Sequence, residues 1–484
     1  MNKAKLLIVI LVIFLLGDLT YSFFEYYYIP IDGDLTAGVV PSVDVQQVLN
    51  DPFGFQMLIS GEKHVNPNRF FAHFFFKEYM QKVPIWMQNM TDPITSVYLS
   101  CALIKIFIHI LFIFILSALI SGTKNILDKK FLIVAALIVP FIQANGYWGH
   151  MGINDRATTY TFFYALPVVL LMLYLMPLYR IFFCHEIKNP RLLKSVFLFI
   201  PAIILPLSGP LIPGIALILT GIISVHYLRN YGYPNKSLSV QSMISALQKI
   251  PSHIFIILAP ICLVSLYSLF LGRFDSNYTS ETIPILDRYL KLPLGIFYQV
   301  SQSLGVPLLL IIIGVNIYLI KRHISSPEGM KIVDSLKWIG IFAAVYLLLL
   351  PLGGYRPYRP NILRYDTFIP ITIALLFFYG ISTFFLLQHM TSRNLNVYLV
   401  GLFIFFAIYM NSDRIETEEY HSERKCLEIL ANSPYEVTKL PATCNIMSWE
   451  PISDPKFSKN NTHMLKFWGI TNKEKIYYQS SEQN

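Results

Sequence analysis

The chain has 484 residues, of which 54% are hydrophobic, 15% aromatic and only 14% charged. This composition is too apolar for a soluble globular fold, and it predicts an all-α polytopic membrane protein. The formal net charge of +9 is spread among the loops and gives no reason to expect a nucleic-acid partner.

Apolar stretches with the length of membrane helices recur along the whole chain. The hydrocarbon core of a bilayer is about 30 Å thick and requires about 20 apolar residues per helix. We predict about eleven transmembrane helices, which begin near Leu6, Ile94, Phe131, Thr158, Leu192, Leu211, Ile254, Val306, Trp338, Phe368 and Val397. The fifth and sixth are short and flank the sequence PLSGPLIPG, which is compatible with a tight hairpin.

The lysine and arginine positions predict the orientation, because short cytoplasmic loops retain positive charge. With the N-terminus in the cytoplasm, the loops GTKNILDKK, YRIFFCHEIKNPRLLK and KRHISSPEGMK all lie inside. We therefore expect an integral plasma (inner) membrane protein whose residues 1–410 form a transmembrane domain, including an outer loop over 30–93. Residues 411–484 form a polar extracytoplasmic tail. Its Cys426 and Cys444 are either free or bridged, as an oxidising compartment permits.

The first outer loop begins with the sequence IDGDLTAGVVPS, which places Asp32 and Asp34 on either side of a glycine just after an apolar helix. The loop is longer than an ordinary connection, which indicates structure or function of its own. Two of its segments, SVDVQQVLND and NRFFAHFFFKEYMQKVPIWMQNM, have apolar residues at helical spacing. They predict amphipathic helices that lie in the membrane interface.

A first helix that runs outward, an Asp-x-Asp at the start of the first outer loop and interfacial helices within that loop together resemble the GT-C superfamily of integral-membrane glycosyltransferases. In that superfamily the matching acidic residue is the catalytic base, and the sugar donor is usually a lipid-linked phosphate or pyrophosphate. The resemblance implies that Asp34 is the general base and that Asp32 orients it. It also implies a lipid-linked sugar donor, a glycan, lipid or protein acceptor and membrane lipids as partners. No cofactor is required, and Mg²⁺ or Mn²⁺ held by Asp32 and Asp34 is an option.

Glycosyl transfer needs a base for the acceptor proton and cations for the charge that develops on the departing phosphate. The later outer sequence GGYRPYRPNILRYD offers three arginines for the second task. The resemblance also implies a second acidic position in the first outer loop, where the sequence GEKHVNPNR offers Glu62 with Lys63, His64 and Arg69 close by. The expected substrate-binding residues in these two sequences are Glu62, Lys63, His64, Arg69, Arg356, Arg359 and Arg364. Arginine binds phosphate bidentately, although these arginines could instead contact lipid headgroups or nearby acids.

Three further cationic or titratable residues join the expected substrate site. Lys105 and His109 lie four residues apart in the second span, where a charged residue is costly and normally faces a cavity. They lie behind the phosphate site, or Lys105 pairs with an acid on a neighbouring helix. Arg156 lies at the start of the fourth span, where a cation opposes the helix dipole unless an anion binds there. In the same sequence, Asn154 or Asp155 is expected to cap that helix.

Two other classes remain as alternatives. A flippase or transporter of lipid-linked glycans would need charged residues near the membrane midplane and prolines inside helices. An O-antigen ligase or polymerase-like enzyme would place its essential residues in a late outer loop and leave Asp34 dispensable. Because most polar residues gather in the outer loops, we favour the transferase.

Overall fold

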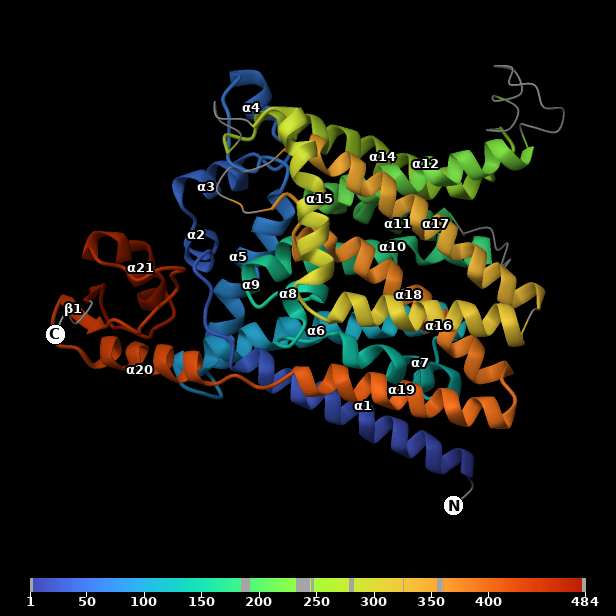
Figure 1. The fold of residues 1–484 in the computed structure, drawn as a ribbon. Coiled ribbons are helices and arrows are strands. Elements are labelled where there is room, and N and C mark those ends of the chain that lie inside the picture. The colour runs from blue at the N-terminus through green and yellow to red at the C-terminus, as the bar shows by residue number, and fades with distance from the viewer. Residues whose placement is uncertain are drawn as a thin grey trace.

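The computed structural model describes residues 3–183, 192–231, 244, 248–277, 283–324, 326–354, 359 and 361–480. Within these ranges, nine helical spans are long and apolar enough to cross a membrane. They are α1 (Lys3–Tyr27), α6 (Pro93–Ser121), α9 (Thr158–Tyr160) continued by the π-helix η2 (Thr161–Ala165) and α10 (Leu166–Phe183), α12 (Leu211–Tyr231), α14 (Ser252–Leu271), α16 (Gly305–His323), α17 (Pro327–Leu349), α18 (Tyr365–His389) and α19 (Ser392–Ser412). They lie side by side as a bundle (Figure 1). The chain is therefore an α-helical polytopic membrane protein.

Two shorter apolar helices occupy the remaining predicted places. Helix α7 (Lys129–Ile138) continues as a 3-10 turn, η1 (Val139–Phe141), and α11 (Leu192–Ile204) continues as η3 (Leu205–Leu207). Both turns contain a proline, which removes a backbone donor and interrupts the regular helix. Within the described ranges neither helix has the length of a full span, so the count of eleven stays a prediction.

Local sequence signals explain where several spans begin and end. At the start of α6, the Asp92 side chain accepts a hydrogen bond from the backbone N–H of Thr95 at 3.0 Å, and Pro93 occupies the first turn. The same helix ends at Gly122, whose φ of 73° is the left-handed conformation favoured by glycine. Ser326 caps α17 in the same way as Asp92 caps α6.

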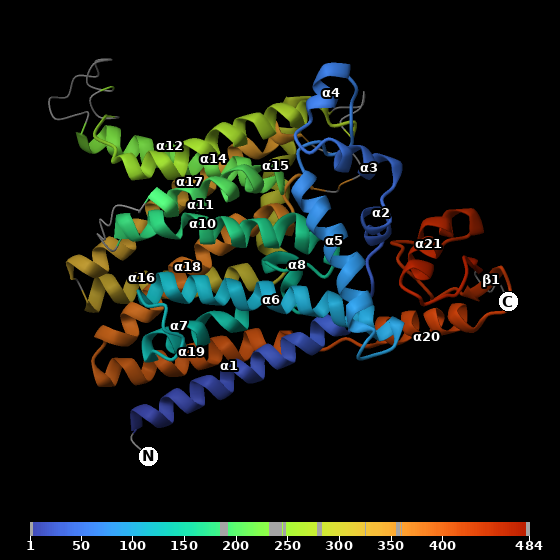
Figure 2. The ribbon, with the colours of Figure 1, turned by 180° about the vertical axis from the view of Figure 1, so that it is seen from behind.

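The chain between α1 and α6 folds into four helices at one end of the bundle: α2 (Leu35–Val39), α3 (Val43–Asn50), α4 (Phe55–Ser60) and α5 (Phe70–Met87). The two helices predicted in this loop are thus present as α3 and α5. Helix α5 (Figure 2) and α15 (Ile285–Ser301; Figure 1) run across the direction of the bundle helices. This direction is the one expected of helices that lie in the membrane interface. Their position in the interface remains a prediction. The same end holds α8 (Trp148–Met151) and the 3-10 turns η4 (Gly272–Phe274) and η5 (Leu350–Gly353).

The residues after α19 form a folded unit at this same end of the bundle, which we call the C-terminal unit (residues 418–480) (Figure 1). It contains α20 (Glu418–Asn432), β1 (Val437–Pro441), η6 (Pro455–Ser458), α21 (Lys459–Phe467) and β2 (Ile476–Ser480). The two strands pair in parallel, with Val437 opposite Ile476. Cys426 and Cys444 form a disulfide, which resolves the alternative left open by the sequence.

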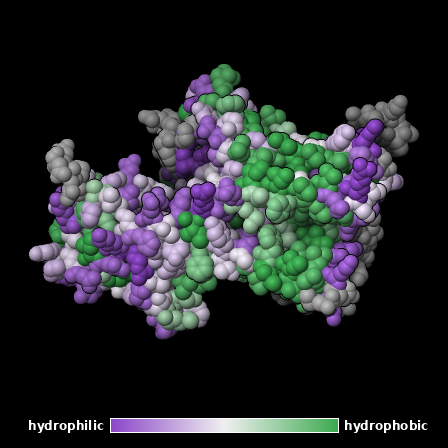
Figure 3. Space-filling model, turned by 60° about the horizontal axis from the view of Figure 1, so that its bottom comes forward, coloured by the Kyte–Doolittle hydropathy of each residue, from purple (hydrophilic) through white to green (hydrophobic). Residues whose placement is uncertain are grey.

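The C-terminal unit is attached to α5. The Trp468 indole donates to the carbonyl of Met80 at 3.0 Å, and the Gln88 amide donates to the carbonyl of Trp468 at 2.7 Å. In Figure 3, hydrophilic residues gather over the C-terminal unit, whereas a broad apolar area covers the bundle. This separation matches a protein that exposes its helices to lipid and its C-terminal unit to water.

The predicted orientation places the C-terminal unit outside the cell, and cysteine labelling tests it. In a background that keeps the disulfide and replaces the other cysteines with serine, Ala442→Cys should react with an impermeant thiol reagent in intact cells. Asn125→Cys should react only after the membrane is permeabilised, because it lies in the loop between α6 and α7. Both positions are exposed to solvent. Labelling of position 125 alone in intact cells would show that the orientation is the reverse of the predicted one.

Candidate functional site

Asp32 lies in the turn that follows α1 and points into the protein. It is 6% exposed, and Thr159 of α9 donates to both of its carboxylate oxygens. The Thr159 hydroxyl reaches Oδ1 at 2.7 Å and its backbone N–H reaches Oδ2 at 3.2 Å. Burial raises the pKa of Asp32, while these hydrogen bonds and the charge of Lys105 oppose the rise. Asp32 therefore joins the start of the segment between α1 and α6 to the start of α9.

Asp34 points the other way, toward the C-terminal unit. It is half-buried, and its Oδ1 accepts a hydrogen bond from the Trp449 indole at 3.1 Å. Between the two acids, Gly33 permits this approach, since a Cβ there would lie 2.8 Å from Cδ1 of Trp449 and 2.9 Å from its backbone nitrogen. The turn thus gives its two carboxylates different environments, one buried and one accessible.

Lys105 of α6 lies behind Asp32 and is fully buried. Its ammonium donates to the carbonyl of Arg156, and its charge acts on the carboxylates of both Asp32 and Asp155. Burial raises the pKa of Asp155 to about 6, against the hydrogen bond from the backbone N–H of Ala157 and the charge of Lys105. Lys105 therefore interacts with acids outside its own helix, while its part in a phosphate site stays a prediction.

Asp155 does not cap α9 as expected. It accepts from the backbone N–H of Ala157, two residues along, at 2.7 Å, and so stabilises the turn that leads into the helix. The N-cap residue of α9 is Ala157, whose side chain offers no acceptor. Asn154 instead donates to the carbonyl of Lys105 at 2.8 Å.

His109 lies one turn after Lys105 and is also buried. Its Nδ1 is 3.4 Å from the hydroxyl of Tyr26, and its Nε2 has no hydrogen-bond partner. Arg156 is engaged at the surface, where its guanidinium pairs with Glu416 and Glu419 at 3.3 Å each. Its charge is thus already balanced by one carboxylate of the segment after α19 and one of α20 in the C-terminal unit.

Two of the predicted arginines lie close enough to Tyr164 for their charges to act on it. Arg364, the residue before α18, pairs with Asp366 in the first turn of that helix. Burial lowers the pKa of Arg364, but the charge of Asp366 and its hydrogen bonds outweigh this and raise the pKa above its usual value. Arg69, the residue before α5, has a buried Nε without a hydrogen-bond partner. Both arginines lie within electrostatic reach of the Tyr164 hydroxyl. Arg359 is half-buried and Arg356 lies outside the described residues.

The remaining residues predicted in the first outer loop lie elsewhere. His64 forms a bridge with Asp275, since its backbone N–H donates to the carbonyl of Phe274 and its carbonyl accepts from Ser276. Glu62 and Lys63 are exposed beside it, with Glu62 3.9 Å from the ring of His64. These contacts join the loop to the segment after α14, and none of them reaches Asp32 or Asp34. Their part in substrate binding stays a prediction.

Glu423 of α20, which no sequence pattern singled out, is buried against the turn that carries Asp32 and Asp34. Its Oε2 accepts hydrogen bonds from the backbone N–H of Ile31 at 2.9 Å and from the hydroxyl of Tyr98 at 2.6 Å. Because Ile31 precedes Asp32, Glu423 holds the turn in place from the C-terminal unit. Burial raises the pKa of Glu423 from 4.5 to about 7, against the hydrogen bonds from Tyr98 and Ile31.

The raised pKa of Glu423 predicts a pH-dependent stability. The folded state favours the protonated carboxyl, so this contribution is fully present below pH 4.5 and is lost as the pH rises through about 7. As the pH rises over this range, the thermal midpoint should decrease less in Glu423→Gln than in the wild type. Glu436→Gln, which changes an exposed residue of the same unit, should show the same decrease as the wild type. Identical pH profiles for wild type and Glu423→Gln would show that Glu423 does not titrate as expected.

In the described part of the chain, Asp32 and Asp34 do not belong to a larger group of potential metal ligands. Within the described part of the chain, no group of three or more histidine, cysteine, aspartate or glutamate side chains could hold a metal ion. Both oxygens of Asp32 already accept hydrogen bonds from Thr159. A divalent ion at Asp32 and Asp34 would need further ligands from substrate or water.

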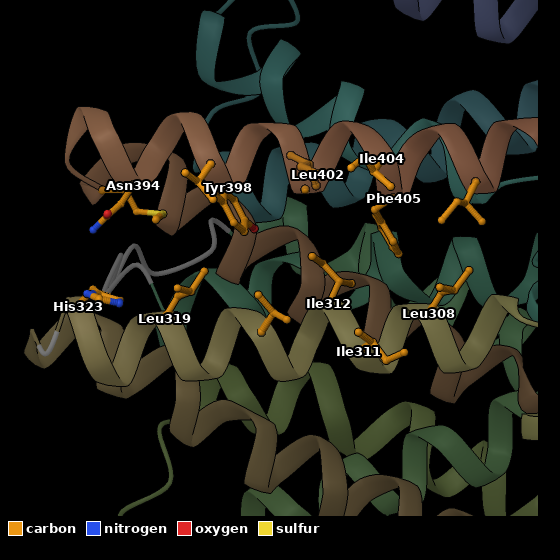
Figure 4. Close-up of a pocket in the computed structure, with 15 residues that line it drawn as sticks. Leu308, Ile311, Ile312, Leu319, His323, Asn394, Tyr398, Leu402, Ile404 and Phe405 are labelled. Carbon is orange, nitrogen blue, oxygen red and sulfur yellow. The ribbon is translucent and has the colours of Figure 1, made fainter.

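A separate apolar groove of about 500 Å³ lies between α16 and α19 (Figure 4). Side chains such as Leu308, Ile312, Leu402 and Phe405 line it, and His323 and Asn394 lie at one end. That end is the C-terminal end of α16, opposite to the end of the bundle that holds Asp32 and Asp34. The groove therefore does not belong to the candidate site.

The fold and the site define an α-helical polytopic membrane protein with an acidic turn at the end of its first helix, in contact with a C-terminal unit. No family model matches the chain, and no curated protein matches it. The function therefore has to be inferred from the site itself.

Proposed function

We propose that this protein is a GT-C-like membrane glycosyltransferase, which moves a sugar from a lipid-linked phosphate or pyrophosphate donor to an acceptor on the extracytoplasmic face. Asp34 takes the acceptor proton as general base, and Asp32 orients the turn. The proposal rests on the different environments of Asp32 and Asp34. Asp32 is buried and hydrogen-bonded on both oxygens, whereas Asp34 is half-exposed and reachable by a substrate. Two carboxylates in different environments can take different roles.

Nearby cations support a phosphorylated donor. A departing phosphate gains negative charge, which guanidinium groups stabilise with paired donors. Arg69 has an unused buried Nε, and Arg364 is held beside Asp366 at the start of α18. The charges of both arginines act on Tyr164, which follows Thr159 by five residues in the same span. We place the donor phosphate near these two arginines, at the start of α5 and the start of α18.

The proposal is tested with the purified full-length protein in proteoliposomes. The vesicles carry a radiolabelled polyprenyl-phosphate-linked sugar and are supplied with a membrane extract as the source of acceptor. Transfer of label from the polyprenyl lipid to a product is the expected result. Movement of the labelled lipid from one leaflet to the other without transfer would overturn the proposal in favour of a flippase.

A further inference from the structure

Trp449 is a large aromatic residue beside the predicted base, yet most of it faces solvent. Its side chain is 59% exposed, although one edge donates the 3.1 Å hydrogen bond to Asp34. Its backbone and ring also lie against Gly33, with no room for a side chain there. A broad apolar ring face is therefore available directly next to the carboxylate.

The loop that carries Trp449 is held firmly by the C-terminal unit. The Asn461 amide donates to the carbonyls of Ile446 at 3.0 Å and Met447 at 3.2 Å. The preceding Cys444 is tied to α20 by the disulfide. Met447 is buried and has a φ of 45°, a left-handed conformation that is uncommon for a non-glycine residue. Trp449 is therefore exposed although the loop that carries it is held in place by these contacts.

We propose that Trp449 is a stacking platform for a sugar ring of the acceptor, so that the acceptor is a glycan and not a protein or a simple lipid. This inference rests on the proposed function. A pyranose ring has one face made of C–H groups, which packs well on the electron-rich face of an indole. With the ring on Trp449, a neighbouring hydroxyl of that sugar reaches Asp34.

The arrangement accounts for each group in the transfer. The acceptor oxygen forms a bond to the anomeric carbon of the donor, while the bond between that carbon and the donor phosphate oxygen breaks. The acceptor proton passes to Asp34, and the phosphate leaves with the bonding electron pair. Trp449 takes no part in these steps, so it is a positioning residue whose loss should affect acceptor binding more than donor binding.

Binding is tested by titrating the full-length protein in detergent with methyl α-D-mannopyranoside, methyl β-D-glucopyranoside, methyl β-D-galactopyranoside and N-acetylglucosamine, with tryptophan fluorescence as the readout. At least one glycoside should give a saturable change that Trp449→Ala abolishes. Trp86→Ala is the matched control, since Trp86 is 63% exposed on α5 and should leave the change intact. No saturable change with any of the four, or one that persists in Trp449→Ala, would overturn the inference.

Transfer kinetics give the second readout. Trp449→Ala should raise the acceptor KM by about tenfold, equivalent to about 1.4 kcal/mol, with little change in donor KM. Trp449→Phe should recover part of the loss, because it keeps a ring face but lacks the hydrogen bond to Asp34. An unchanged acceptor KM in Trp449→Ala, with transfer still dependent on Asp34, would refute the platform and leave the proposed function standing. Glycoside binding that depends on Trp449, without any transfer, would support the platform and refute the proposed function.

A membrane role is the competing explanation, because tryptophan is also enriched at the interface between membrane and water. Quenching of tryptophan fluorescence by brominated phosphatidylcholine in proteoliposomes separates the two. Trp449→Ala should leave the extent of quenching unchanged if Trp449 faces the acceptor. A marked decrease in quenching for this variant would assign Trp449 to the lipid surface and overturn the inference.

Discussion

Replacing Asp34 with asparagine should lower glycosyl transfer by about 10²- to 10⁴-fold, the range that accompanies loss of general acid–base catalysis. Asparagine has nearly the same shape and can still accept the hydrogen bond from Trp449 through its carbonyl oxygen. It cannot take a proton from an acceptor hydroxyl. Protein level and binding of the polyprenyl-linked donor should therefore persist while the transfer rate falls.

Two matched variants show whether the effect belongs to Asp34. Asp44→Asn neutralises an exposed carboxylate of α3 in the same loop and should leave transfer unchanged. Asp32→Asn should also lower the thermal midpoint, because Asp32 is buried, hydrogen-bonded to Thr159 and close to Lys105. Wild-type turnover in both Asp34→Asn and Asp32→Asn would exclude the turn as the reaction site. The flippase and the ligase would then be the better explanations.

The sequence predicted the helices of the bundle because their apolar runs are local properties of the chain. It also predicted α3 and α5 from helical spacing within the first outer loop. It predicted that the span beginning near Leu192 is short, whereas the span beginning near Leu211, also expected to be short, forms the 21-residue α12. It did not predict that α7 ends at Ile138, although Pro140 marks the turn where the helix changes to 3-10 geometry. The position of a proline indicates where a helix is weakened, but packing decides whether the helix ends there.

The candidate site was predicted only in part, because its support comes from distant segments. Asp32 and Asp34 were identified from a short motif, but their partners Thr159 and Trp449 lie 127 and 415 residues away in the chain. Glu423 is 392 residues from Ile31. In the sequence it is one of several charged residues in an ordinary amphipathic helix. Only docking of the C-terminal unit makes it a buried residue of the site.

Lys105→Met should destabilise the protein by an amount on the order of 3 to 5 kcal/mol, the cost of removing one member of a buried charge group. Methionine fills a similar volume, but it leaves the carbonyl of Arg156 without its donor. It also leaves the carboxylates of Asp32 and Asp155 without the cation that favours their charged forms. Chemical unfolding in mixed micelles measures the loss. Lys82→Met is the control, since Lys82 is exposed and forms a surface pair with Glu78, which contributes about 1 kcal/mol or less.

A double variant distinguishes charge balance from lost packing. If the destabilisation arises from unpaired carboxylates, adding Asp155→Asn to Lys105→Met removes one buried negative charge and should recover part of the loss. If it arises only from packing, the two effects should add. Equal stability of Lys105→Met and wild type would show that Lys105 does not hold these acids. Recovery in the double variant would link the stability of the second predicted span to Asp155, which lies just before Thr159, the residue that hydrogen-bonds to Asp32.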